Sequence, residues 1–394
     1  MAIDNKDKKV LNVPHLRFPE FSGEWKKYSF NDIAQYKKGP FGSALKKEIF
    51  VPKSADSVKI YEQQNAIKKD WELGRYYISR DYFINHMQQF IVEAGDIIVS
   101  CAGTIGEIYE LPPNAVSGVF NQALMRVRIN ATLIDKNIFI KVFSSMIDSF
   151  SKIYSNGSAI KNIPPFADLK KTNVFLPTQN EQYKISRLIS LLDERIATQN
   201  KIIEDLKKLK SAISLNVLHS DTWEQFKIKD IAKIGRGRVI SSIEISQQKN
   251  PTYPVYSSQT SNNGIMGYLD DYMFEGEHIS WTTDGANAGT VFYRNGKFNC
   301  TNVCGLLKFR KEFDTYFVSL VLAEATKKYV SINLANPKLM NNTMGNIQIR
   351  LPKLEEQKRI SIVFRELQKL WTVHNSLLTK YTKQKQYLLS QMFI

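Results

Sequence analysis

The strongest constraint on the fold is an internal repeat. One unit begins at Trp25 with the letters WKKYSFNDIAQYKKG, and a second begins 198 residues later, at Trp223, with WEQFKIKDIAKIGRG. Each unit is followed by the pattern L-P-x-x-x-E-Q, first at 176–182 and again 175 residues later, at 351–357. Two repeated motifs in the same order indicate a duplicated module. We therefore expect two copies of one domain along the chain.

Two segments carry the three-and-four spacing of apolar residues that is typical of a coiled-coil seam. They are 179–218 and 355–393, and neither contains Gly or Pro. Each therefore predicts one long helix, and the nearest partner for its seam is the other copy. Polar residues interrupt both seams at equivalent positions, Gln199 and His374. Antiparallel pairing would bring these two side chains together as a polar layer that fixes the register.

The segments between these helices have a mixed pattern of strands and amphipathic helices. Apolar runs at 90–92, 96–99, 123–129, 253–257, 278–281, 289–293 and 304–309 predict strands, and 136–154 and 315–330 predict helices. We predict an α+β fold in which two mixed α/β domains are separated by two long helices that form an antiparallel intramolecular coiled coil with pseudo-two-fold symmetry. The expected parts are a lead-in at 1–23, a first domain at 24–178, a first helix at 179–219, a second domain at 220–352 and a second helix at 353–394.

The charge balance favours a polyanionic partner. Lys and Arg outnumber Asp and Glu by 54 to 38, which gives a formal net charge of +16. Such an excess is typical of nucleic-acid binding, because neutralised phosphates release counterions; the alternative is a basic protein whose charge only keeps it in solution. The three cysteines, Cys101, Cys300 and Cys304, lack the companions of a zinc site. We find no signal peptide and no apolar run that could span a bilayer, and expect a cytoplasmic protein without a membrane.

The sequence offers no convincing catalytic motif. The letters IPPF at 163–166 resemble the [DNS]-P-P-[YFW] motif of DNA amino-methyltransferases. The first residue of that motif must hydrogen-bond the target amino group, which Ile163 cannot do, and Asn162 lies one position too early. The letters GRGR at 235–238 lack the third glycine of a dinucleotide-binding fingerprint. We expect no catalytic residue, metal or cofactor on this chain. Two alternatives remain open: a degenerate or fragmentary DNA adenine methyltransferase, and a non-catalytic assembly adaptor.

Candidate DNA contacts come from residue chemistry and from duplicated position. Cations flank glycines at matching places in the two copies, and no acidic residue nearby in the sequence neutralises them; glycine would let the backbone approach phosphates. Other candidates combine aromatic rings with charge, or carry small polar side chains that can face base edges. Each group has a plainer alternative as an exposed turn, a packed surface strand or a polar loop. The candidates are Lys37, Lys38, Ser43, Lys46, Arg75, Tyr76, Arg80, Arg236, Arg238, Ser257, Gln259 and Asn262.

The arrangement resembles one family over residues 14–394. Two domains that each open with a W…D-I-A…G segment and close with L-P-x-x-x-E-Q before a long helix are similar to the DNA-specificity subunit of type I restriction–modification systems. The lead-in LRFPEF at 16–21 is also similar to that of many members. The resemblance implies that each domain is a target-recognition domain reading half of a split double-stranded DNA sequence, and that the helices set the spacing and dock modification (methylase) subunits. It also implies that the modification subunits use S-adenosylmethionine and that the restriction subunits use ATP and Mg.

Overall fold

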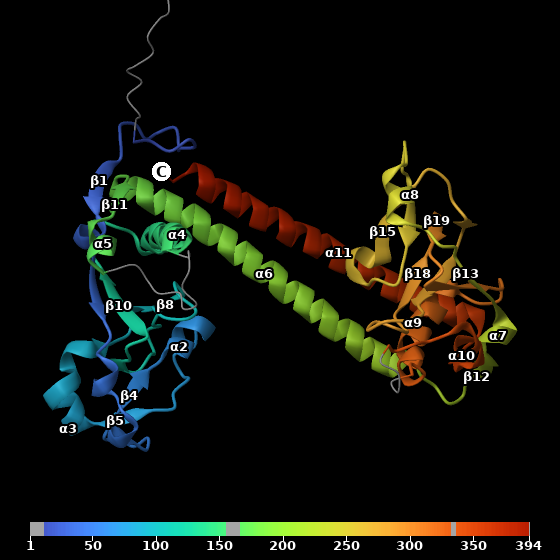
Figure 1. The fold of residues 1–394 in the computed structure, drawn as a ribbon, viewed down its shortest axis with the longest axis horizontal. Coiled ribbons are helices and arrows are strands. Elements are labelled where there is room, and N and C mark those ends of the chain that lie inside the picture. Colours follow the sequence, from blue (N-terminus) through green and yellow to red (C-terminus); the bar gives the residue numbers. More distant parts are fainter. Residues whose placement is uncertain (1–11, 155–165, 332–335, 394) are drawn as a thin grey trace, which may run out of the picture. The chain divides into compact units, whose positions relative to one another are not determined.

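The computed structural model describes residues 12–154, 166–331 and 336–393 (Figure 1). The chain divides into two compact units: the first contains residues 1–196 and 380–394, and the second contains residues 197–379. Each unit combines one globular domain with part of each long helix. The expected fold class is confirmed, because both domains are mixed α/β and the two long helices pack against each other.

The first unit contains two sheets and a two-stranded ribbon. The four-stranded sheet runs β2 (Ala34–Lys38), β10 (Leu124–Ile129), β7 (Ile97–Ser100) and β8 (Ile108–Glu110). The five-stranded sheet runs β3 (Phe50–Val51), β5 (Tyr77–Ser79), β4 (Ser57–Tyr61), β9 (Gly118–Phe120) and β6 (Ile91–Val92). The ribbon pairs β1 (Lys26–Ser29) with β11 (Asn173–Leu176). All pairings are antiparallel except that of β4 with β9.

The second unit repeats this topology strand for strand, apart from a counterpart of β3. Its first sheet runs β13 (Ala232–Arg236), β20 (Cys304–Phe309), β17 (His278–Thr282) and β18 (Val291–Arg294). Its second sheet runs β15 (Ile265–Leu269), β14 (Tyr253–Tyr256), β19 (Lys297–Cys300) and β16 (Phe274–Glu275), and its ribbon pairs β12 (Glu224–Lys227) with β21 (Gln348–Leu351). The parallel pair recurs as β14 with β19. The duplication predicted from two short repeated motifs thus extends through the whole domain.

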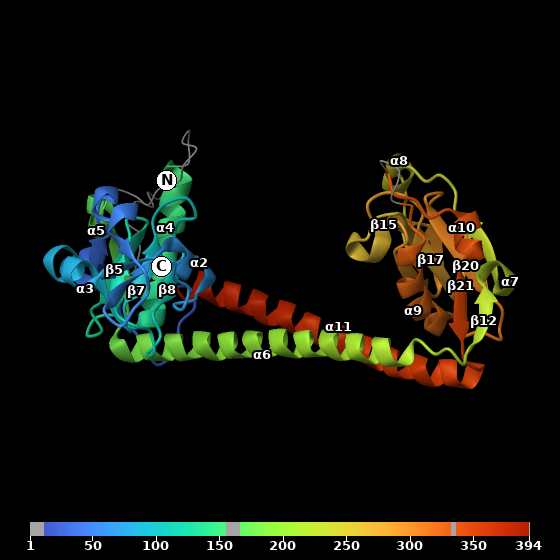
Figure 2. The same cartoon turned by 90° about the horizontal axis from the view of Figure 1, so that it is seen from below.

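One long helix packs on the first sheet of each unit. In the first unit α4 (Lys136–Tyr154) covers a core that includes Ile97, Val127 and Phe139. In the second unit α9 (Thr315–Ala325) packs on β17 and β18 (Figure 2). The sequence predicted that this helix would continue to residue 330, but it ends at Ala325 and tightens into a 3-10 turn. There the Thr326 hydroxyl turns inward and donates to the carbonyl oxygen of Gly289 at 2.9 Å.

Shorter helical elements occupy the connections. In the first unit they are α1 (Phe30–Ile33), η1 (Gly42–Ala44), η2 (Lys47–Ile49), α2 (Gln63–Lys68), α3 (Arg80–Tyr82), the π-helical η3 (Phe83–Met87), η4 (Gln88–Phe90) and α5 (Phe166–Lys171). In the second unit they are α7 (Ile228–Ile231), α8 (Ser242–Ser246), η5 (Ser261–Gly264), η6 (Thr326–Lys328) and α10 (Asn341–Asn346).

The two long helices are α6 (Gln179–Val217) and α11 (Leu354–Gln391), and their pairing is antiparallel. Within the first unit, Lys385 Nζ lies 2.5 Å from the Asp193 carboxylate, and Arg195 donates to the Tyr381 hydroxyl at 3.3 Å. Partner numbers on α11 therefore fall as those on α6 rise. In the second unit, the α6 residues Ile213 and Val217 pack with the core cluster that contains Ile360 and Phe364 near the start of α11.

The repeated L-P-x-x-x-E-Q pattern forms the same clamp in both units. Gln182 donates from Nε2 to the Pro177 carbonyl oxygen at 3.0 Å and accepts at Oε1 from the Asp135 amide at 2.7 Å. In the second unit Gln357 donates to the Pro352 carbonyl oxygen at 2.8 Å and accepts from the Asp314 amide at 2.9 Å. Asp135 and Asp314 each cap the helix that covers the sheet, with their side chains accepting from its first amides. The buried glutamine thus ties the start of each long helix to its domain.

Candidate nucleic-acid interface

In each unit, the ends of three strands meet at one edge of the domain. In the first unit Gly39, directly after β2, packs against Asn121, directly after β9, and the Asn121 amide donates to the carbonyl oxygen of Tyr61, the last residue of β4. In the second unit Gly237 packs against Cys300, and the Thr301 amide donates to the carbonyl oxygen of Tyr256 at the end of β14. We call this region the strand-end edge. It brings together candidate DNA-contacting residues that are far apart in the sequence.

Two lysines of the first strand-end edge keep a charge that no carboxylate neutralises within the described part of the chain. Lys37 Nζ donates to Gln89 Oε1 at 2.8 Å and lies 5.1 Å from the ring centroid of Phe90. Both contacts are with neutral groups, so they orient the ammonium without cancelling its charge. Lys38 is exposed at the end of β2. The pair is therefore available to an anion.

The loop that follows β2 presents a large apolar side chain to solvent. Phe41 is 89% exposed, and Ser43 and Lys46 beside it are also exposed. The loop is nevertheless anchored, because Leu45 packs on a core cluster and the Tyr82 hydroxyl donates to the Ala44 carbonyl oxygen at 2.8 Å. The sequence singled out Ser43 and Lys46 but missed Phe41, whose only signal is its place between cations in the turn that the two copies share.

The equivalent turn of the second unit carries Arg236, Arg238 and an exposed Val239, which matches Phe41 in position. Arg236 donates from Nε to Asn341 Oδ1 at 2.9 Å and has no carboxylate partner among the described residues. The expectation that nothing nearby neutralises the arginines is wrong for Arg238. Its guanidinium forms an ion pair with Glu244, six residues later, and this hydrogen bond lowers the pKa of that carboxyl group. The short α8 helix returns Glu244 to the turn, which the sequence did not reveal.

The glycines of these turns have a structural role that differs from the predicted one. A Cβ atom on Gly39 would lie 2.0 Å from the Asn121 carbonyl oxygen, and one on Gly237 would lie 1.6 Å from the Cys300 carbonyl oxygen. Any side chain would therefore overlap the neighbouring backbone. Glycine is required here by packing between strand ends, so approach of the backbone to a phosphate is not needed to explain it.

The aromatic and charged group of the first domain forms exposed ion pairs. Arg75 pairs with Glu62 at 3.0 Å, and Arg80 pairs with Asp56 at 3.0 Å. The Tyr76 ring is stacked on Phe50 with centroids 4.5 Å apart. Exposed pairs of this kind contribute about 1 kcal/mol or less, so a phosphate could replace the carboxylate. The strand-packing alternative describes Tyr76 best.

The polar segment after β14 forms a turn whose backbone is hydrogen-bonded by the buried side chain of Arg294. Arg294 donates to the Asn263 carbonyl oxygen and to the Ser280 hydroxyl, both at 2.9 Å, and its guanidinium carbon lies 3.6 Å from the Tyr256 ring centroid. Burial lowers the pKa of this arginine. A buried cation without a carboxylate partner in the described chain is a costly arrangement, which indicates that the shape of this turn matters. This contact could not be predicted from the sequence, because Arg294 lies on a strand 31 residues from Asn263.

The three polar candidates near this turn, Ser257, Gln259 and Asn262, lie in different environments. Asn262 is exposed in the left-handed region, with φ of 48°. The Ser257 hydroxyl accepts from Thr301 at 3.5 Å, and Arg238 forms a backbone bridge with the same threonine. The strand-end edge therefore brings Arg238 and Ser257 to one place. Gln259 instead donates its amide nitrogen to the Ile265 carbonyl oxygen, so it does not have both amide groups free for an adenine.

The two polar residues of the helix seams lie in contact. Nδ1 of His374 is 2.7 Å from Oε1 of Gln199, on adjacent faces of α11 and α6 within the second unit. The pair is partly buried between apolar residues of the seams. Such a pair disfavours shifted registers, which would leave each polar group without its partner.

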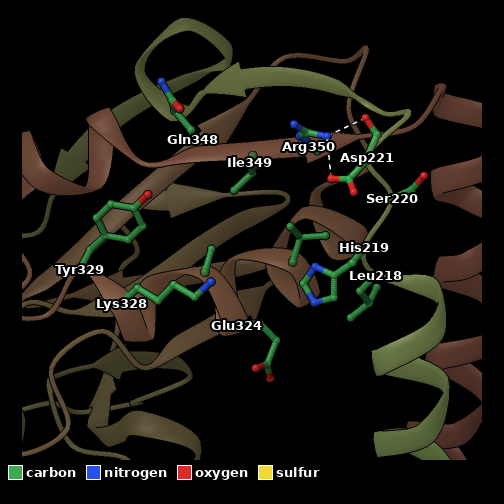
Figure 3. Close-up of a pocket in the computed structure, with 12 residues that line it drawn as sticks. Leu218, His219, Ser220, Asp221, Glu324, Lys328, Tyr329, Gln348, Ile349 and Arg350 are labelled. Carbon is green, nitrogen blue, oxygen red and sulfur yellow. Dashed lines mark hydrogen bonds and ion pairs between the residues drawn. The ribbon is translucent and has the colours of Figure 1, made fainter.

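A polar cavity of about 480 Å³ lies between the end of α6, α9 and β21 (Figure 3). His219, Glu324 and Lys328 line it, and Arg350 on its wall forms an ion pair with Asp221 at 2.9 Å. Within the described ranges, no group of three His, Cys, Asp or Glu side chains could hold a metal ion. The methyltransferase-like stretch at 163–165 lies outside the described residues. No helix in the described part of the chain is long and apolar enough to cross a membrane.

Two copies of one α/β domain, each followed by a long helix, define a class of tandem-domain proteins. The chain belongs to the type I restriction modification DNA specificity domain family, whose model matches residues 22–208 and 220–380. This confirms the resemblance drawn from the repeated motifs.

Curated relatives match part of the chain. A putative type I specificity subunit N-terminus from Mycoplasma pneumoniae is 46% identical over 140 residues, which is 35% of this chain and 74% of that relative. The type I restriction enzyme MpnII specificity subunit of the same organism is 43% identical over 150 residues, which is 38% of this chain and 44% of that relative. The match thus spans less than half the length of the second relative.

Solved structures match nearly the whole chain in fold. The S subunit of a type I restriction-modification system from M. genitalium has a TM-score of 0.67 at 18% identity, covering 97% of this chain and 99% of that one. A chain solved in a study of complex assembly and conformational transition of the type I R-M system has a TM-score of 0.55 at 14% identity, covering 94% of this chain and 97% of that one. At these identities the likeness shows the fold alone.

Proposed function

We propose that this chain is the DNA-specificity subunit of a type I restriction–modification complex, and that each globular domain reads one half of a two-part target in double-stranded DNA. The observation that carries the proposal is the duplicated strand-end edge, where cations free of carboxylates lie beside exposed polar and apolar side chains. Membership in a DNA specificity family supplies the biological context.

The two kinds of side chain at this edge have different roles. Lys37, Lys38, Lys46 and Arg236 lack carboxylate partners in the described chain and contact phosphates, which positions the domain on the duplex. Groups that can face base edges, such as Asn262, supply the sequence information. Arg75, Arg80 and Arg238 would first have to exchange a carboxylate for a phosphate, so their contribution is smaller.

The paired helices set the distance between the two half-sites and dock the modification subunits. Each turn of α6 advances by roughly 5.4 Å, whereas each base pair occupies about 3.4 Å of DNA. A deletion of one turn should therefore alter the gap between half-sites and leave their sequences unchanged. In this account the chain contributes recognition only and acts in the cytoplasm. S-adenosylmethionine binds the modification subunits, and ATP and Mg bind the restriction subunits.

The proposal is tested by salt-dependent DNA binding of the complex assembled with its modification subunits. Arg236→Ala should weaken binding and reduce the slope of log K against log salt concentration by about 0.9 for each phosphate that the variant no longer neutralises. Lys311→Ala is the matched control, because Lys311 follows β20 at the opposite end of the same sheet. If wild-type complex shows no salt-dependent binding, the assembly-adaptor alternative is favoured. Binding of S-adenosylmethionine by the isolated chain would favour the degenerate methyltransferase.

A further inference from the structure

The N-terminal lead-in occupies a defined cradle in the first unit. Arg17 donates from Nε and Nη2 to the two carboxylate oxygens of Glu181, both at 2.7 Å, and the Trp25 indole nitrogen lies 3.4 Å from the same carboxylate. Glu181 is completely buried, and its bidentate hydrogen bond raises the pKa of Arg17. A buried carboxylate requires such a partner. We call Trp25, Glu181 and Lys184 the first cradle.

Lys184 completes the first cradle one helical turn after Glu181. Its ammonium forms an ion pair with Glu20 and lies 5.9 Å and 5.7 Å from the ring centroids of Phe18 and Phe21. The Leu16 amide also donates to the Gln391 carbonyl oxygen at 2.9 Å, which fixes the start of the lead-in on α11. The Phe21 amide donates to the Phe18 carbonyl oxygen at 3.1 Å, so the lead-in forms a turn here. The cradle therefore recognises three features of one turn-forming segment: an arginine, an aromatic residue directly after it, and an acidic residue two positions further on.

The second unit retains the residues of this cradle at equivalent positions. Trp223 corresponds to Trp25, because each begins one copy of the repeated segment. Glu356 corresponds to Glu181, and Arg359 to Lys184, at the constant interval of 175 residues. Both charged residues are exposed, and neither has an ion-pair partner among the described residues. We call Trp223, Glu356 and Arg359 the second cradle.

The second cradle is open because the chain enters it by a shorter route. Only residues 218–223 connect α6 to β12, whereas a lead-in of at least fourteen residues, 12–25, precedes β1. A groove of about 480 Å³ remains beside Trp223, with Phe226, Phe313 and Pro352 among its lining. Three carboxylates, those of Glu224, Glu312 and Glu356, line it against the single ammonium of Lys353. This acidic, aromatic groove contrasts with the net charge of +16 on the whole chain.

We propose that the second cradle binds a turn-forming segment of a partner protein in which an arginine is followed by an aromatic residue. The arginine lies on Glu356 as Arg17 lies on Glu181, and the aromatic ring lies against Arg359 as Phe18 lies against Lys184. DNA does not fit this groove, since its carboxylates repel phosphates. The lead-in of a second copy is already held by its own buried Glu181, and its release would leave that carboxylate without a partner. The proposal concerns protein docking and does not depend on DNA reading by the strand-end edge.

A fluorescent peptide with the sequence of residues 12–24 is the probe, titrated onto the full-length chain at low salt. The peptide should bind with one-to-one stoichiometry. Glu356→Gln should weaken it by about tenfold or more, because the amide has no negative charge and offers the arginine one acceptor oxygen instead of two. Glu355→Gln is the matched control, since Glu355 is exposed next to Glu356 but does not line the groove. A peptide carrying Arg17→Ala should lose affinity by a similar factor.

Three results would overturn the proposal. The first is no binding of the wild-type peptide at millimolar concentration. The second is equal binding to the Glu356→Gln and Glu355→Gln proteins, which would mean that the peptide displaces the resident lead-in or binds elsewhere. The third comes from sedimentation of the chain alone: a dimer that dissociates on Glu356→Gln would identify the occupant as the lead-in of a second copy. Glu356 is exposed, so the variant should keep the wild-type unfolding temperature, which checks that the protein is folded.

Discussion

Replacing Gln182 or Gln357, the glutamines of the two clamps, with alanine should destabilise the unit that contains it. The loss of stability should be larger in the first unit. In each case a buried carbonyl oxygen, that of Pro177 or Pro352, and a partly buried amide, that of Asp135 or Asp314, lose their hydrogen-bond partner, and in the first unit the Leu133 carbonyl oxygen loses one as well. An unsatisfied buried polar group costs about 1 to 3 kcal/mol, so the pair costs about 2 to 6 kcal/mol.

The two clamps differ in their access to water. Gln357 borders the open groove of the second cradle. In the Gln357→Ala variant, water can therefore enter and hydrogen-bond the Pro352 carbonyl oxygen and the Asp314 amide. At the other clamp, the lead-in covers the neighbouring Glu181. We therefore expect Gln182→Ala to lower the free energy of unfolding by about 3 to 5 kcal/mol and Gln357→Ala by about 2 to 3 kcal/mol.

Chemical denaturation combined with amide hydrogen exchange separates the two units. Each variant should reduce protection of its own capping amide, Asp135 for Gln182→Ala and Asp314 for Gln357→Ala, and leave the other amide unchanged. Glu355→Ala, an exposed change on the first turn of α11, controls for the loss of a side chain. If Gln357→Ala changes the free energy of unfolding by less than about 0.5 kcal/mol, or if Asp314 keeps its protection, the clamp does not hold the helix to the domain.

Three further perturbations test other parts of the account. Gly237→Ala should cost about 3 kcal/mol or more in denaturation experiments, because its Cβ would overlap a carbonyl oxygen, whereas Gly235→Ala meets nothing within 4 Å and should change stability by less than about 1 kcal/mol. A double-mutant cycle with Gln199→Leu and His374→Leu should give a coupling of about 0.5 to 1.5 kcal/mol; a coupling near zero would remove the polar layer as a stabilising contact. Burial lowers the pKa of His278 below its ordinary value of about 6.5, so the unfolded state binds this proton first. Stability should therefore fall as the pH is lowered through about 6.5, and His278→Phe should flatten that dependence.

The elements with strong periodicity could be predicted from the sequence. The α6 and α11 helices follow seams that each have one polar interruption, and β7, β10, β17 and β20 overlap apolar runs long enough to be recognised. The second sheet of each domain was not predicted as a unit. Strands such as β3 and β16 are only two residues long, and their pairing depends on partners far along the chain.

The site was less predictable because its side chains are defined by contacts between distant segments. Local sequence located the turns after β2 and β13, since repeated glycines and cations mark both. It did not reveal that Glu244 pairs with Arg238, because that contact depends on a five-residue helix between two turns. It also could not show that Arg17 reaches Glu181, 164 residues away, or that the equivalent place in the second unit is open.

We propose that the two domains each read one half of a DNA target independently. A domain exchange tests this independence: residues 24–178 are replaced with the same region of a relative, and methylated adenines are mapped in the genome of a strain that carries the hybrid with its modification subunits. We predict that one half of the recognition sequence changes, while the other half and the gap between them stay the same. A change in both halves, or no change in either, would contradict independent reading by the two domains.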